Sequence, residues 1–167
     1  MSKVIQHLNI LHNNPFLLTP IIVNFYEKYS GNQEKDMLLA YLILPLVLYE
    51  SSKLILKTKR KELRTFINCF QREQVEKSKL EIKKNDKLFG LPGRVEEYKE
   101  LTNLCLQYGF DTGSLQLNRD LSITFLKNDF KADNSSVEYI KAAENLALLL
   151  KKEKITHIYM KLGVKKI

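Results

Sequence analysis

Apolar residues recur at helical spacing along most of the chain. Asn14 can cap a helix that starts at Pro15 and keeps its apolar pattern over Phe16–Tyr29. A second apolar run, Met37–Tyr49, contains thirteen residues without a charge. Because this run is too short to cross a bilayer and is apolar on all sides, we expect it to form the central buried helix. Pro45 should bend or end that helix.

The middle of the chain predicts two further helices, each with one apolar face. Apolar residues return at helical spacing after a basic stretch, at Leu63, Phe66, Ile67 and Phe70. The bases of that stretch should therefore lie on the opposite face. Residues 71–87 mix charges of both signs and predict an exposed helix extension or a loop. After a turn at Pro92-Gly93, the pattern of Val95–Tyr108 predicts an amphipathic helix that Gly109 closes as its C-cap.

The last third changes from a period of two back to a helical period. Apolar and polar residues alternate over 115–117 and 121–125, on both sides of Asn118-Arg119-Asp120, which predicts a short β-hairpin. The Ser135-x-x-Glu138 capping box then opens a helix that reaches Leu150. Residues 155–162 predict a final helix or turn that ends at Gly163.

These elements predict a mainly α fold with a small β-hairpin, of the α+β class. We expect a single domain over residues 1–167, with an N-terminal helical part at about 1–87. The helix-hairpin-helix part, at about 88–167, is compatible with a winged-helix-like C-terminal half.

Charge is placed unevenly along this sequence. The chain has 27 Lys+Arg and 19 Asp+Glu, a formal net charge of +8. Residues 51–87 hold 12 bases and 5 acids, net +7, and residues 151–167 hold 6 bases and 1 acid, net +5. Two basic clusters are candidate contacts for DNA phosphates or for an acidic partner: Lys57, Lys59, Arg60, Lys61 and Arg64, and Lys151, Lys152 and Lys154. The other interpretation is a solvated helix face.

Motifs that would support catalysis are missing from the sequence. It has no G-x-x-x-x-G-K or G-x-G-x-x-G loop, no H-E-x-x-H and no C-x-x-C. Glu81-Ile82-Lys83 and Asp129-Phe130-Lys131 have the acid-x-Lys form of a nuclease half-site, but so charged a chain should contain such matches by chance. We therefore expect a protein that is not an enzyme, with no catalytic residue, no cofactor and no metal site.

Cys69 and Cys105 lie within helical apolar patterns. We therefore expect both to be reduced packing residues of a cytoplasmic protein. No run of about 18 apolar residues predicts a membrane span.

Several short signatures, scattered over nearly the whole chain, resemble one known family. They are Asn14-Pro15, Leu44-Pro45, Ala142-Ala143-Glu144-Asn145-Leu146 and the closing Thr156–Val164 stretch with Leu162-Gly163-Val164. The chain resembles the middle component of bacterial three-component ABC systems, the small accessory subunit of Lamassu-type anti-phage defence.

The resemblance implies a non-catalytic adaptor that bridges an SMC/Rad50-like ATPase, which senses DNA, and a nuclease-type effector. Its partner contacts would then use exposed apolar side chains, with Phe16, Tyr26, Ile158, Tyr159 and Leu162 as candidates. The alternative is a free-standing DNA-binding regulator of the winged-helix type, which the basic patch and the hairpin favour. Such a regulator should form a homodimer and bind duplex DNA alone, with a steep salt dependence.

Overall fold

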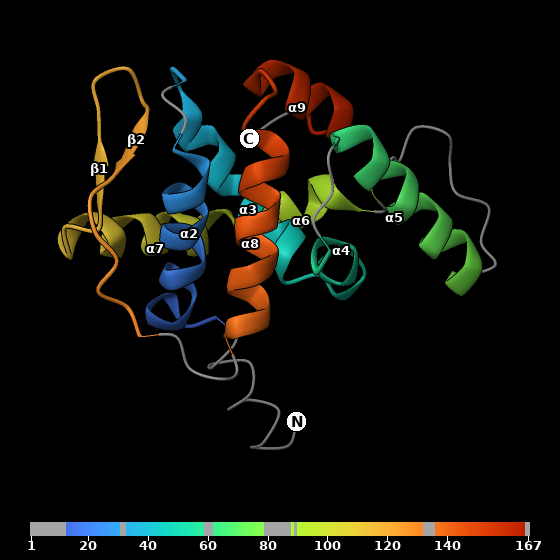
Figure 1. The fold of residues 1–167 in the computed structure, drawn as a ribbon, viewed down its shortest axis with the longest axis horizontal. Coiled ribbons are helices and arrows are strands. Elements are labelled where there is room, and N and C mark those ends of the chain that lie inside the picture. Colours follow the sequence, from blue (N-terminus) through green and yellow to red (C-terminus); the bar gives the residue numbers. More distant parts are fainter. Residues whose placement is uncertain are drawn as a thin grey trace.

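The computed structural model describes residues 13–30, 33–58, 62–78, 88, 90–131 and 136–165. Figure 1 shows the elements in chain order, which are α2 (Pro15–Tyr29), the 3₁₀ helix η1 (Asp36–Leu39), α3 (Ala40–Val47), α4 (Glu50–Leu56), α5 (Leu63–Ser78), α6 (Leu91–Glu97), α7 (Lys99–Asp111), β1 (Leu115–Leu117), β2 (Ile123–Phe125), α8 (Val137–Leu150) and α9 (Ile155–Leu162). The predicted class, mainly α with a small hairpin, is confirmed.

Helix α2 is the central support of the fold. It lies side by side with α8, and α7 packs across it (Figure 1). Side chains in the interior of these helices are fully buried, among them Ile22 and Phe25 on α2 and Leu146 on α8. The predicted start of α2 is confirmed, because Asn14 Oδ1 accepts the Phe16 backbone N–H at 3.0 Å and proline follows at the first helical position.

The charge-free run of residues 37–49 lies in the core, as predicted, but as η1 followed by the short helix α3. Pro45 lies inside α3, and the chain bends two residues later, where the η1–α3 segment and α4 meet at 105°. The Ser52 hydroxyl donates to Leu46 O and Tyr49 O at this bend, and Tyr49 O also accepts the Lys53 N–H of the first turn of α4.

Within the described residues, no single helix is long and apolar enough to cross a membrane. The bent pair Asp36–Val47 and Glu50–Leu56 satisfies the same test by length and composition alone. Leu42, Leu44 and Leu46, on the first of these segments, are fully buried in the protein core.

Two predicted boundaries around α7 are wrong. Pro92-Gly93 does not form a turn but lies in the first turn of α6, where proline's missing N–H leaves no helical bond unmade. Gly109 is not a C-cap, since α7 continues past it and Gly113, with φ of 67°, supplies the left-handed residue. A Cβ on Gly109 would lie 3.1 Å from Leu115 Cδ1, so this glycine permits the close approach of β1.

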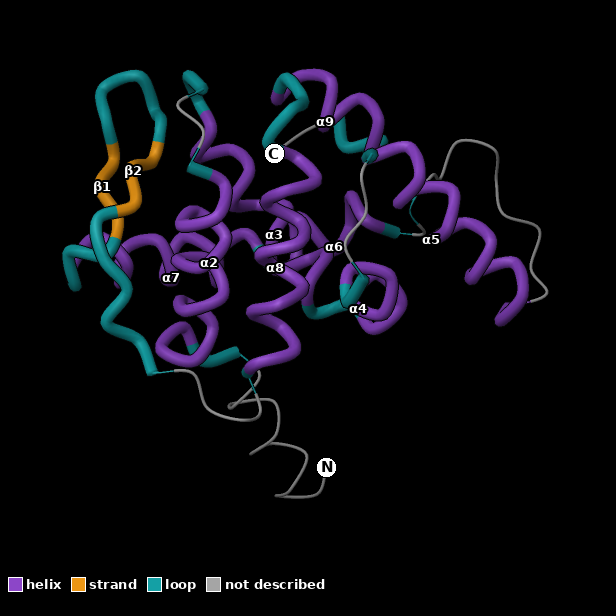
Figure 2. Tube along the Cα trace, in the orientation of Figure 1, coloured by secondary structure: helices purple, strands orange, loops and turns teal. Residues whose placement is uncertain are grey.

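The predicted hairpin forms, with Leu115 opposite Phe125 and Leu117 opposite Ile123, but its second strand begins at Ile123 and not at Leu121, whose φ is 61°. Its strands are the ones that Figure 2 draws in orange, and β2 contacts α2. The two helices that flank the hairpin, α7 and α8, both pack on α2. The winged-helix likeness of this half remains a prediction.

Candidate partner-binding site

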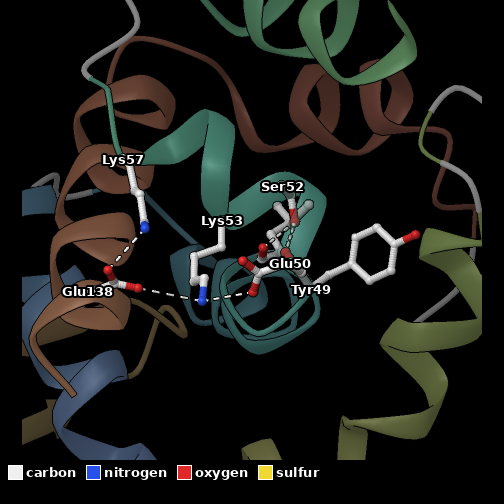
Figure 3. A network of polar contacts seen from close by, with 7 residues as sticks. Tyr49, Glu50, Ser52, Lys53, Lys57 and Glu138 are labelled. Atoms are coloured by element: carbon white, nitrogen blue, oxygen red, sulfur yellow. Dashed lines mark hydrogen bonds and ion pairs between the residues drawn. The ribbon is translucent and has the colours of Figure 1, made fainter. Parts of the chain in front are cut away.

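The first basic cluster begins at an ion-pair network between α4 and α8. Lys57 Nζ lies 2.9 Å from Glu138 Oε1, and Lys53 Nζ lies 2.8 Å from Glu50 Oε2 and 3.7 Å from Glu138 Oε2 (Figure 3). The Lys53 side chain is only 8% exposed and its ammonium lies over the Tyr139 ring, 4.6 Å from the centroid. Lys57 is therefore a paired cation in this structure.

Hydrogen bonds in this network favour the charged forms of Glu138 and Lys53. The bond from Lys57 lowers the pKa of Glu138, and the bond to Glu50 raises the pKa of Lys53. Asn145 on α8 adds a neutral contact, since its Nδ2 donates to Leu56 O at 2.7 Å and to Lys57 O at 3.4 Å. The network thus fixes the C-terminal end of α4 on α8.

Of the other residues of the first cluster, the structure describes Arg64. Arg64 is exposed on α5, whose Leu63, Phe66, Ile67 and Phe70 are buried as the pattern predicted. Lys59, Arg60 and Lys61 lie outside the described residues, as does the Glu81–Lys83 half-site.

The second cluster lies where the C-terminal ends of α2 and α8 meet. Lys151 Nζ donates to the hydroxyl of Ser30, the C-cap of α2, at 2.8 Å, and Lys152 and Lys154 are exposed. Lys151 is the C-cap of α8, where a cation complements the helix dipole, so part of its role is structural. We call Lys151, Lys152 and Lys154 the basic turn.

The opposite end of α2 carries exposed aromatic and apolar side chains. Phe16 is 60% exposed, and its ring meets the Tyr108 ring edge-on with centroids 4.7 Å apart. The Phe130 ring lies on Tyr108 as well, at 6.0 Å, and Leu104, one turn before Tyr108 on α7, is 56% exposed. We call Phe16, Leu104, Tyr108 and Phe130 the Phe16 patch.

Three of the five predicted apolar contacts are not exposed. Tyr26 is 1% exposed, and its hydroxyl donates to Asp36 O at 2.9 Å; Ile158 and Leu162 are 0% and 1% exposed. The prediction of exposure was wrong at these positions because their helical spacing is that of a core-facing stripe. Tyr159 is half-buried and donates to Leu38 O, so Phe16 alone of the five is widely exposed.

Asp36 carries a buried carboxyl group that no sequence pattern indicated. Its Oδ1 accepts the Ile123 N–H at 2.7 Å, which ties β2 to η1, while Oδ2 has no hydrogen-bond partner among the described residues. Burial raises the pKa of this carboxyl to about 6. The tip of the hairpin is held at the same place, since Lys35 N donates to Asp120 O and Met37 N to Leu121 O.

Three kinds of candidate catalytic group can be located among the described residues. In that part of the chain, no three His, Cys, Asp or Glu side chains are grouped to hold a metal ion. Burial raises the pKa of the Cys105 thiol to about 11, which disfavours a thiolate nucleophile. In the Asp129–Lys131 half-site, the Asp129 carboxylate is exposed and paired with Lys127.

Comparison with known families matches residues 2–166 to the family described as ABC-three component (ABC-3C) system Middle Component 3. No curated protein and no solved structure matches the chain. The match covers both ends of α2 and both basic clusters, and it confirms the resemblance seen in the sequence. The chain therefore belongs to the middle component 3 family of ABC-three component systems, whose members are accessory subunits that work with the other components of a defence system.

Proposed function

We propose that this chain is a non-catalytic adaptor that bridges an SMC/Rad50-like ATPase and a nuclease-type effector of a Lamassu-type system. In that role it holds the effector and releases it when the complex senses DNA. One observation carries the proposal, namely that two exposed surfaces of opposite chemistry lie at the two ends of α2.

The two surfaces are separated by a rigid element. The Phe16 patch begins in the first turn of α2, and the basic turn contacts its C-cap through Lys151 and Ser30. A helix of 15 residues spans about 22 Å at about 1.5 Å per residue. Helix α8 packs along α2 (Figure 1). At this separation, a partner on one surface would leave the other surface open.

The chemistry of the surfaces supports two different partners. The Phe16 patch is aromatic and apolar, as the centres of protein interfaces are. Lys152 and Lys154 are exposed cations suited to an acidic protein surface or to DNA phosphates held by the complex.

The test is to purify the ATPase and effector components with and without this chain. We expect the effector to co-elute with the ATPase only when the chain is present, and nuclease activity to stay with the effector. Association of the two without the chain would refute the bridging role. A homodimer that binds duplex DNA alone, with a steep salt dependence, would favour the winged-helix regulator instead.

A further inference from the structure

The exposed face of α7 combines the apolar part of the Phe16 patch with two carboxylates. Glu100, Leu104, Tyr108 and Asp111 recur at intervals of four, four and three residues, so they share one helix face. Glu100 and Asp111 are exposed, Leu104 is 56% exposed, and Tyr108 is half-buried beside Phe16. We call these four residues the α7 stripe.

The stripe is held in a fixed position. The Thr19 hydroxyl donates to Cys105 O at 3.2 Å, and Cys105 Sγ lies 3.8 Å from Pro15 O. These contacts fix the first turn of α2, and with it Phe16, against α7. A rigid apolar surface loses little conformational entropy when a partner binds.

The Asp111 carboxylate lies in the last turn of α7, where its negative charge destabilises the helix. A carboxylate in the last turn of a helix faces the negative end of the helix dipole, and none of the described residues of that turn is basic. The Gln107 amide donates to Asp111 Oδ1 at 2.7 Å, but it brings no positive charge. A cation from a partner would satisfy this carboxylate.

We propose that the Phe16 patch and the α7 stripe together bind a basic, apolar segment of another component of the ABC-3C system. This inference rests on the proposed adaptor function and specifies its apolar end. The partner segment places a large apolar side chain on Phe16, Leu104 and Tyr108, and a Lys or Arg against each carboxylate. Glu100 and Asp111 are eleven positions apart on α7 and so lie about 16 Å apart along it, which fixes the spacing of the two cations.

The experiment measures the affinity of the full chain for each purified component of its own system. Phe16→Ser and Leu104→Ser should each weaken binding of one component at least about tenfold. The matched control is Met160→Ser, because Met160 is 66% exposed on α9, away from the stripe. It should leave the affinity unchanged.

Charge reversal at Asp111 separates a binding role from a structural one, because binding should weaken while the stability of the isolated chain increases. Asp111→Lys should weaken the complex about tenfold and reduce its dependence on salt. The same variant should raise the Tm of the isolated chain by about 1–4 °C, because a cation suits the helix C-terminus. Glu62→Lys, at an exposed position before α5, is the control and should leave the affinity unchanged.

The outcomes separate this inference from the adaptor function. If the components bind the chain and the Phe16, Leu104 and Asp111 variants bind as tightly as the parent, the stripe is not the docking surface and the adaptor function stands. If no component binds the parent chain, the adaptor function itself fails. Self-association lost in Leu104→Ser would assign the surface to a second copy. Faster amide exchange in α7 after deletion of residues 1–12 would assign it to that segment. Either result overturns the proposal.

Discussion

The Lys57 ammonium lies 2.9 Å from the Glu138 carboxylate, across the contact between α4 and α8. This ion pair matches the charge of Lys57, the first residue of the first basic cluster, with a carboxylate. The Asn145 amide bonds the last carbonyls of α4 beside it, so the backbone at that point is held as well. The exposed bases of the basic turn, Lys152 and Lys154, have more freedom to meet a partner.

Lys57 and the basic turn should therefore contribute unequally to binding of DNA or of an acidic partner. The double variant Lys152→Ala/Lys154→Ala should weaken the assembled complex and reduce the slope of log affinity against log salt by about one to two. Lys57→Ala should change neither quantity measurably, because its charge is already matched. Titration at three salt concentrations measures both effects, and an equal loss in Lys57→Ala would contradict this assignment.

The stability of the fold should depend on the Asn145 side chain as a hydrogen-bond donor. Asn145→Asp replaces a donor that points at Leu56 O and Lys57 O with a carboxylate that can only accept, in a side chain 5% exposed. We expect a loss of about 2–4 kcal/mol in the free energy of unfolding at neutral pH.

Acid should partly reverse that loss, because a protonated carboxyl group can donate again. The folded-state pKa of the new group is raised, so its destabilisation is present above that pKa and fades as the pH falls through it. Urea unfolding across a pH series measures the trend. If the loss in free energy of unfolding does not depend on pH, the donor role of the Asn145 amide does not explain the effect of the substitution.

Asp36 should make the parent chain less stable at neutral pH than a neutral residue would. Its pKa is about 6 when folded against an ordinary value of 3.8, so the folded chain takes up a proton before the unfolded chain as the pH falls. This group's contribution to the free energy of unfolding therefore rises from about pH 6 down to about pH 4. Asp36→Asn keeps the acceptor for Ile123 N–H and removes the buried charge.

We expect Asp36→Asn to be more stable than the parent by about 1–3 kcal/mol above pH 6, with the difference shrinking toward pH 4. Urea unfolding of both proteins at the two ends of this range measures it. A difference that grows as the pH falls would reverse the sign and refute the account.

Two glycines in neighbouring helices should respond differently to alanine. At Gly93, in α6, a Cβ would meet nothing within 4 Å, so Gly93→Ala should raise stability by about 0.5–1 kcal/mol. At Gly109 a Cβ would lie 3.1 Å from the buried Leu115 side chain, which must then shift. Gly109→Ala should therefore lack this gain or lower stability. Thermal unfolding compares the two, and an equal gain would show that β1 does not need the glycine.

Much of the fold follows from local patterns in the sequence. Asn14-Pro15 at the start of α2, the hairpin and the span of α9 were predicted correctly, because caps, alternation and helical spacing act over a few residues. Gly109 was misplaced because its role depends on Leu115, which approaches it only in the folded chain.

The candidate site was less accessible to prediction for the same reason. An apolar stripe on a helix predicts burial, and only the packing of α9 and α2 shows that Ile158 and Tyr26 are covered while Phe16 is not. The pairing of Lys57 with Glu138 joins residues 81 positions apart, so charge counting could not separate paired from unpaired bases. Asp36 gave no signal, since a single acid at a helix start is ordinarily a surface residue.

The central claim is that one chain holds two different partners at the two ends of α2. Its most direct measurement is the composition of the complex formed when ATPase and effector are mixed with the parent chain or with either of two variants. Phe16→Ser is predicted to lose one component and keep the other, and Lys152→Glu/Lys154→Glu is predicted to show the reverse. Loss of the same component in both variants, or of neither, would contradict the bridging account.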